Sequence, residues 1–241
     1  MVGRLPSGDY RLAPWRRIRW RPMVELQAVL FDMDGTLCDT EPAWIAAEFD
    51  LARSYAAEWS HADALHVVGT DLLDSGAYIR QRMGLPLSPE QIAAELVDRV
   101  LASVAPDGVP WRPGALELLV ACNEAGLPTA LVTMSYRRLT DVILARMPVG
   151  RFDAVVTGED VTRGKPAPDA YLRAADLLGV SAPACVAIED SPAGADAAAA
   201  AGCLVIAVPN TIDIPIVPGR HRLATLEGAA VADLRSLLSQ R

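Results

Sequence analysis

Residues 27–36 read QAVLFDMDGT, a short apolar run that stops abruptly at two acids and a glycine, Asp32, Asp34 and Gly35. An apolar run of this length, bounded by polar residues, is typical of a buried strand in a parallel sheet. Four similar runs follow along the chain, at Thr129–Thr133, Ala154–Thr157, Cys185–Glu189 and Leu204–Val208. The sequence therefore predicts five buried strands.

Helical patterns separate these predicted strands. They are found at Pro113–Asn123, at Pro168–Leu178 before Gly179, and between Ser191 and Gly202. Proline in the first turn and glycine just after the last turn are typical of helix boundaries. Alternating strands and helices predict an α/β fold, a doubly wound, Rossmann-like parallel sheet.

The stretch from about Pro42 to Pro110 breaks this alternation, because it shows helical patterns and no convincing strand pattern. We expect helices at Ala43–Glu58, Asp71–Met83 and Pro89–Val104. Ser88 and Gln91 resemble a capping box at the start of the third. The sequence therefore predicts a core domain made of residues 23–41 and 111–241, with residues 42–110 inserted as an all-helical domain after the first strand.

Residues 1–22 differ from the rest of the chain, because they carry six arginines, one aspartate and three prolines without a hydrophobic period. We interpret them as a disordered extension or as the product of a start codon upstream of Met23, with a basic arm for an acidic partner as the alternative. Their net charge is +5, which leaves −13 for the remainder of a chain whose total is −8. That balance argues against non-specific binding of nucleic acid.

Composition places the chain among ordinary globular proteins, with 51% hydrophobic and 22% charged residues. No apolar run approaches the ~18 residues of a membrane span, and no secretory signal pattern is found at the N-terminus. The four cysteines form no CxxC pair, and no histidine pattern completes a zinc site. We expect a cytoplasmic monomer with reduced thiols and no membrane association.

Chemically useful side chains follow the predicted strands. They are Asp32, Asp34, Thr133, Glu189 and Asp190, with Lys165 in the loop between the third and fourth strands. Ligands of open parallel sheets bind outside the carboxyl ends of the strands, so we expect these residues to converge. Four clustered carboxylates repel one another unless a divalent cation lies among them, and hard oxygen ligands favour Mg²⁺ over zinc. Each residue alone has an ordinary structural explanation, whereas the ordered set favours a phosphate site.

Four motifs in the expected order resemble the haloacid dehalogenase-like superfamily. Asp32-Met33-Asp34-Gly35-Thr36 is similar to its motif I, Thr133 to motif II, Lys165 to motif III, and Glu189-Asp190 to motif IV. The resemblance covers about residues 27–240. The helical insert is similar to the class I cap of that superfamily, and residues 34–42 resemble the branch that contains small sugar-phosphate phosphatases and β-phosphoglucomutase.

The resemblance implies a role for each matched residue. Asp32 is then the nucleophile that forms an aspartyl-phosphate, and Asp34 is the general acid and base. Thr133 holds phosphoryl oxygens, and Lys165 neutralises charge on the nucleophile and the phosphoryl group. The implied Mg²⁺ ligands are the Asp32 carboxylate, the Asp34 carbonyl and Asp190, with Glu189 as a ligand or a support behind the ligands.

Three functions remain open at this point. Asp34 favours phosphate esters over dehalogenation or phosphonate cleavage, which need no acid there. A β-phosphoglucomutase-like enzyme needs basic groups for a second phosphate, whereas residues 42–110 contain ten acids against four arginines, Arg53, Arg80, Arg82 and Arg99. We therefore expect a Mg²⁺-dependent phosphatase for a small sugar or polyol monophosphate, with the mutase as the alternative. A catalytically idle binding or regulatory protein is the third possibility, and the intact set of acids, lysine and threonine argues against it.

Overall fold

The computed structural model describes residues 24–240, with the backbone alone for residues 105–107. The expectations for residues 1–22 and for a start at Met23 lie outside the described residues.

The core is a parallel six-stranded sheet with the order β3-β2-β1-β4-β5-β6. The strands are β1 (Ala28–Phe31), β2 (Thr129–Val132), β3 (Ala154–Val156), β4 (Cys185–Glu189), β5 (Leu204–Ala207) and β6 (Arg220–Arg222). Strand β1 lies in the middle, with Val29 aligned with Thr129 on one side and with Val186 on the other. The chain extends the sheet first to one side of β1 and then to the other, so the predicted doubly wound fold is confirmed. The crevice where the order reverses is the usual ligand site.

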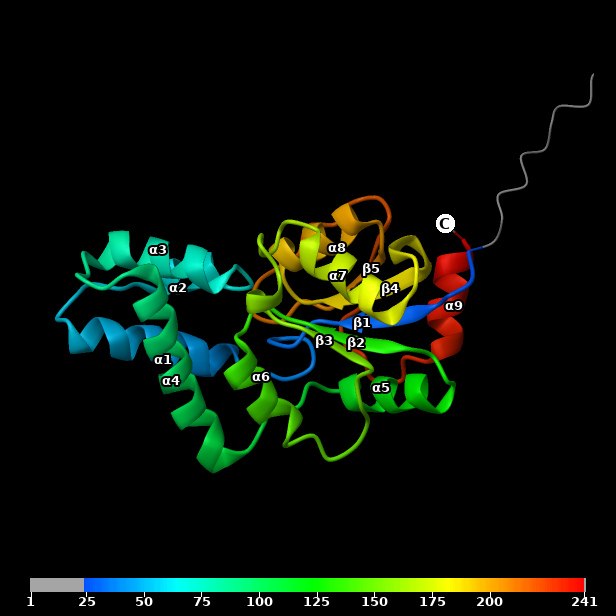
Figure 1. Ribbon diagram of the computed structural model, residues 1–241, viewed down its shortest axis with the longest axis horizontal. Coiled ribbons are helices and arrows are strands. Elements are labelled where there is room, and N and C mark those ends of the chain that lie inside the picture. The colour runs from blue at the N-terminus through cyan, green and yellow to red at the C-terminus, as the bar shows by residue number, and fades with distance from the viewer. Residues whose placement is uncertain (1–23, 241) are drawn as a thin grey trace, which may run out of the picture.

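Helices cover both faces of this sheet (Figure 1). One face carries α5 (Ala115–Glu124), α6 (Arg137–Leu144) and α9 (Val231–Ser239), and the other carries α7 (Asp169–Leu178) and α8 (Pro192–Ala201). Alternate residues of β1 explain this arrangement, because Val29 and Phe31 join one apolar cluster while Ala28 and Leu30 join the other. The alanines of α8 pack into the second cluster, where small side chains allow a close approach to the sheet. The 3₁₀ turns Gly158–Asp160 and Ala182–Ala184 complete the connections.

The segment between β1 and α5 is all-helical, as expected. This helical insert contains α1 (Glu41–Ser54), α2 (His61–Val67), α3 (Leu72–Met83) and α4 (Pro89–Asp107), and it projects from the core at one end of the molecule (Figure 1). Ser60, Asp71 and Ser88 accept hydrogen bonds from backbone N–H groups at the starts of α2, α3 and α4. These caps explain why helices begin there.

Some boundaries differ from the predictions. The helix expected at Ala43–Glu58 begins two residues earlier, at Glu41. It ends at Ser54, because Ala56 adopts a left-handed backbone conformation with φ of 51°. Three helices and one strand, α2, α6, α9 and β6, were not expected. Strand β6 reads RHR and lies at the sheet edge, where no buried apolar run is needed.

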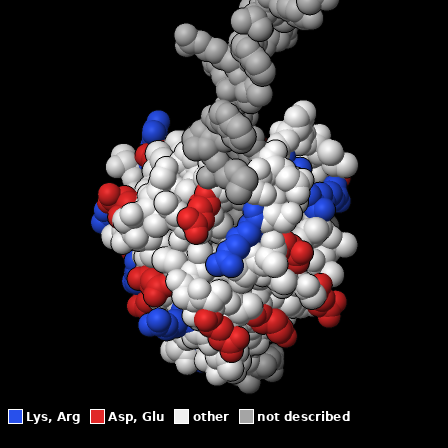
Figure 2. Space-filling model, turned by 90° about the vertical axis from the view of Figure 1, so that its right-hand side faces the viewer, with Lys and Arg blue, Asp and Glu red and all other residues white. Residues whose placement is uncertain are grey.

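The end of the molecule opposite the insert carries positive and negative side chains close to one another (Figure 2). This mixture gives no broad basic surface in that view. Within the described residues, helices that combine the length and the apolar character needed to cross a bilayer are absent.

Candidate active site

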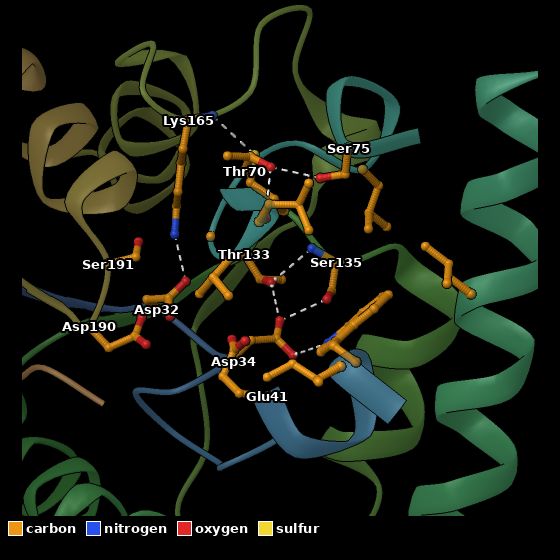
Figure 3. Close-up of a pocket in the computed structure, with 18 of the residues that line it drawn as sticks. Asp32, Asp34, Glu41, Thr70, Ser75, Thr133, Ser135, Lys165, Asp190 and Ser191 are labelled. Atoms are coloured by element: carbon orange, nitrogen blue, oxygen red, sulfur yellow. Dashed lines mark hydrogen bonds and ion pairs between the residues drawn. The ribbon is translucent and has the colours of Figure 1, made fainter. Parts of the chain in front are cut away.

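A pocket lies between the carboxyl edge of the sheet and the helical insert (Figure 3). Its core side brings together five of the six site residues expected from the sequence: Asp32, Asp34, Thr133, Lys165 and Asp190. Asp32 and Asp34 follow β1, Thr133 follows β2, and Asp190 follows β4. The sixth, Glu189, is fully buried at the end of β4 behind the pocket. The sheet therefore gathers residues that are far apart in the sequence.

Lys165 joins two of the acids. Its Nζ lies 2.6 Å from Oδ1 of Asp32 and 2.6 Å from Oε1 of Glu189, and it donates to the carbonyl oxygen of Val132 at 3.0 Å. Burial alone would lower the pKa of Lys165, but the neighbouring carboxylates of Asp32 and Glu189 raise it above its usual value. Lys165 is therefore a permanent positive charge at the base of the pocket.

The oxygens of Glu189 are already engaged. Its Oε1 also accepts a hydrogen bond from the hydroxyl of Tyr171, and its Oε2 accepts one from Ser191 Oγ at 3.4 Å. A side chain on Gly194 would collide with this carboxylate, since a Cβ there would lie 2.0 Å from Oε2. The surroundings of Glu189 thus hold it in the position from which it contacts Lys165.

Asp32 and Asp190 lack this degree of compensation. Burial and the charge of Glu189 raise the pKa of Asp32 to about 8, although Lys165 opposes the shift. Burial and the charge of Asp32 likewise raise the pKa of Asp190 well above its usual value. Oδ2 of Asp32 and Oδ2 of Asp190 are buried without a hydrogen-bond partner among the described residues. Two carboxylate oxygens in this condition are an energetic cost to the folded protein.

A divalent cation fits these orphaned oxygens. Ligand atoms of Asp32, Glu189 and Asp190 all lie within 4.8 Å of one another. Gly35 keeps the position open, because its φ is +80° and a Cβ would lie 1.9 Å from Oδ2 of Asp190. An all-oxygen, acidic set is the kind that Mg²⁺ accepts.

Asp34 is held by four donors. Its Oδ1 accepts from the hydroxyl of Thr40 and, at 3.0 Å, from the indole N–H of Trp44. Its Oδ2 accepts from Thr133 Oγ1 at 3.2 Å and from Ser135 Oγ at 2.7 Å. Two of these donors follow β2 in the core, and the other two lie at the start of the insert. The Asp34 carboxyl therefore connects the two parts of the molecule.

The insert adds residues that the sequence analysis did not identify. Glu41 and Glu48 on α1 are each only 4% exposed, and both line the pocket. Burial, reinforced by the charge of Asp34, raises the pKa of Glu41 to about 8. Burial also raises the pKa of Glu48 to about 8, although the hydrogen bond from Trp59 opposes the shift. The spacing of Glu41, Trp44 and Glu48 predicts that they share one face of a helix, but it does not indicate that this face lines a pocket.

The four insert arginines are not among the residues that line the pocket. Arg53 is paired with Asp50, Arg82 with Asp63 and Arg99 with Glu95, while Arg80 is exposed. Among the described residues that line the pocket, Lys165 is the one lysine or arginine. The positive charge of the pocket lining is thus that of Lys165 beside Asp32, and the described residues on the insert side of the lining contribute none.

Comparisons with known proteins agree with this geometry. A family profile described as haloacid dehalogenase-like hydrolase matches residues 26–202. Hexitol phosphatase A of Escherichia coli (strain K12) is 39% identical over 190 residues, which cover 77% of this chain and 84% of the relative. Protein CbbY of Rhodobacter capsulatus is 34% identical over 197 residues, with 78% and 87% covered.

Solved structures show the same architecture. CbbY from Rhodobacter sphaeroides in complex with phosphate superposes with a TM-score of 0.76 at 26% identity, over 87% of this chain and 99% of that one. β-Phosphoglucomutase from Clostridium difficile has a TM-score of 0.77 at 19% identity, over 89% and 98%, a likeness of fold. The resemblance found in the sequence is therefore confirmed, and the chain belongs to the family of haloacid dehalogenase-like hydrolases.

Proposed function

We propose that this hydrolase is a Mg²⁺-dependent phosphatase that acts on a small sugar or polyol monophosphate through an aspartyl-phosphate on Asp32. The observation that carries the proposal is the pairing of Oδ1 of Asp32 with Lys165 at 2.6 Å, which leaves Oδ2 without a partner among the described residues. Lys165 fixes one oxygen and offsets its negative charge, and the other oxygen is available to bind a cation or to attack phosphorus. Relatives named hexitol phosphatase and phosphoglycolate phosphatase support the same chemistry.

The reaction has two steps. In the first, a carboxylate oxygen of Asp32 forms a bond to phosphorus while the phosphorus–oxygen bond to the substrate alcohol breaks, and Asp34 gives its proton to the departing alkoxide. In the second, Asp34 takes a proton from water as the water attacks phosphorus, and the bond to Asp32 breaks to release inorganic phosphate. In each step one of the four hydrogen bonds to Asp34 is replaced by a hydrogen bond between Asp34 and the reacting oxygen, which belongs to the alcohol in the first step and to water in the second.

Thr133 and Lys165 stabilise the charge that moves during these steps. Thr133 follows β2, and its hydroxyl donates to Oδ2 of Asp34; in this proposal the hydroxyl turns from Asp34 to a phosphoryl oxygen when the substrate binds. Lys165 contacts the nucleophile directly and balances the charge that develops on the phosphoryl group.

The acidic cluster holds the cation in this proposal. The carboxylates of Asp32 and Asp190 and the carbonyl of Asp34 are its ligands, and Glu189 supports them by holding Lys165. Mg²⁺ supplies positive charge that offsets repulsion between these acids and the phosphoryl oxygens.

A monophosphate with an uncharged body fits the pocket best. Lys165 is the single cation among its described lining residues, and residues 42–110 carry a net charge of −6. A second phosphate on the insert side would face Glu41 and Glu48 without a basic partner. We also propose that residues 42–110 act as a cap domain that closes over Asp32 and excludes bulk water.

A sugar phosphomutase is the second candidate. Its support is the resemblance of residues 34–42 to the branch that contains β-phosphoglucomutase, whose fold this chain shares. The experiment is to compare kcat/KM for mono- and bisphosphorylated sugars of similar size at matched ionic strength, with and without Mg²⁺. We expect preference for the monophosphate and release of free phosphate. Preference for the bisphosphate, or movement of phosphate within the sugar, would favour the mutase; absence of turnover of every substrate would favour the idle protein.

A further inference from the structure

Glu48 is a buried acid that the proposed reaction does not use. It lies on α1 with 4% of its surface exposed and lines the pocket on the insert side. Its Oε2 accepts a hydrogen bond from the indole N–H of Trp59 at 3.1 Å. Trp59 is the one hydrogen-bond partner found for the Glu48 side chain among residues 24–240, and Oε1 is not one of the fully buried unpaired oxygens, so it faces the space of the pocket. One half of the carboxyl is therefore anchored, and the other half is free.

This arrangement leaves one carboxyl oxygen available to a ligand. An oxygen that faces the pocket without a protein partner can form a hydrogen bond with a bound molecule, which an apolar side chain in the same place could not do. Burial also raises the pKa of Glu48 to about 8, so the group is largely protonated at neutral pH. A protonated carboxyl both donates and accepts hydrogen bonds, which is the capacity needed to bind a hydroxyl group.

The position of Glu48 defines where such a hydroxyl would lie. Glu41 and Glu48 are seven residues apart on one face of α1, a separation of about 10 Å along the helix axis. Trp44, between them, contacts Asp34 at the phosphate end of the pocket. Glu48 thus lies farther out along the insert than the residues around Asp34, where the body of a substrate extends from its phosphate.

Two hydroxyl groups on the insert side are already satisfied. Thr70 Oγ1 lies 2.7 Å from Ser75 Oγ and donates to the carbonyl oxygen of Val67, and Ser75 Oγ donates to the carbonyl oxygen of Asp71. Much of the remaining lining there is apolar, including Leu72 and Leu96. Glu41 on the same wall also has no side-chain hydrogen bond among the described residues, but it lies at the Asp34 end, so Glu48 is the unpaired polar group at the outer end of α1.

We propose that Glu48 is a specificity residue that binds a hydroxyl group of the substrate body through Oε1, and that Trp59 positions its carboxyl for this contact. The inference rests on the proposed function and deepens it, because it restricts the substrate class to monophosphates with a polyhydroxylated body. A second phosphate is the less suitable alternative ligand, because the insert side of the described lining offers it no lysine or arginine.

The test compares a hexitol monophosphate with n-hexyl phosphate, which has the same phosphate and carbon chain without the hydroxyl groups. Glu48→Leu removes the hydrogen-bonding group, Glu48→Gln keeps it in neutral form, and Glu58→Leu on the exposed surface beside Trp59 is the matched control. We expect Glu48→Leu to lower kcat/KM for the hexitol phosphate about tenfold, the effect of one hydrogen bond, and to change that for hexyl phosphate less than about twofold. Glu48→Gln and Glu58→Leu should stay within about threefold of wild type on both substrates.

An unchanged ratio of the two kcat/KM values in Glu48→Leu would overturn the inference, whether both values fall equally, which indicates a structural role, or neither value falls. A wild-type enzyme that hydrolyses both phosphates equally well would overturn it too, while leaving the proposed phosphatase intact. If neither phosphate is turned over, the proposed function fails, and calorimetric titration of Asp32→Asn with both phosphates decides the inference separately. Tighter binding of the hexitol phosphate that is lost when Glu48→Leu is added supports it, and equal binding of the two overturns it.

Discussion

The indole N–H of Trp44 donates a 3.0 Å hydrogen bond to Oδ1 of Asp34. Trp44 lies on α1 of the insert, whereas Asp34 follows the central strand of the core. The residue proposed to carry the proton is therefore held partly by the element proposed to open and close the pocket. A change in the position of the insert must change the hydrogen bonds that orient this acid.

Replacing Trp44 by phenylalanine tests this connection. The variant Trp44→Phe keeps an aromatic ring beside α1 and removes one of the four donors to Asp34. One neutral hydrogen bond contributes about 0.5–1.5 kcal/mol, so we expect kcat to fall between about two- and tenfold. An unchanged kcat would contradict the connection.

Lys165 is predicted to stabilise the fold as well as the reaction. It is 3% exposed and lies 2.6 Å from both Asp32 and Glu189. Lys165→Ala leaves two buried carboxyls without their cation, which typically costs about 3–5 kcal/mol. Urea unfolding at neutral pH measures this loss. The exposed Arg173→Ala, which breaks a surface ion pair with Asp176, is the control and should change stability by less than about 1 kcal/mol. Similar effects of the two variants would refute the prediction.

Stability should also depend on pH through Glu48. Its pKa is about 8 in the folded protein against 4.5 as the ordinary value, so the folded protein retains a proton that the unfolded chain releases. The stabilisation from this group is complete below about pH 4.5 and is lost as the pH rises through about 8. Glu48→Gln accepts the hydrogen bond from Trp59 without titrating.

The free energy of unfolding of Glu48→Gln, relative to wild type, should therefore increase between pH 5 and pH 9. One pKa unit corresponds to about 1.4 kcal/mol, so the gain is on the order of a few kcal/mol. Denaturant unfolding at several pH values measures it. A constant difference between the two proteins over this range would contradict the raised pKa.

Magnesium should stabilise the folded protein through Asp190. The unpaired Oδ2 atoms of Asp32 and Asp190 predict that adding Mg²⁺ raises Tm and that a chelator abolishes hydrolysis. Asp190→Asn should weaken both effects, because it removes one negative ligand. Both Glu189 oxygens already have partners, so Glu189→Gln should weaken the contact with Lys165 and should affect the binding of Mg²⁺ less. Full activity in a chelator, or an unchanged Mg²⁺ effect in Asp190→Asn, would contradict the metal site.

Much of the core could be predicted, because its buried strands are also the apolar runs of the sequence. The run Ala28–Phe31 is apolar because both faces of β1 are covered, and Asp32 marks the edge where the sheet ends. The rule that parallel strands end at one edge was enough to bring Asp32, Thr133 and Asp190 together. Strand Arg220–Arg222 was missed because an edge strand needs no apolar run.

The insert side of the pocket could not be predicted in the same way. Glutamates on an amphipathic helix are usually exposed, so Glu41 and Glu48 gave no signal of burial. Their environment depends on how α1 packs against α4 and, for Glu48, on the contact with Trp59, which spacing along the chain does not determine. Residues at strand ends are therefore easier to assign than residues on a helical wall.

The proposed role of Asp32 as the nucleophile can be measured directly. The measurement is brief incubation with a ³²P-labelled monophosphate, followed by an acid quench and peptide mapping. We expect a covalent phosphate on the peptide containing Asp32 in wild type, and loss of both label and turnover in Asp32→Asn. Wild-type-like hydrolysis by Asp32→Asn, or label on a different residue, would contradict it.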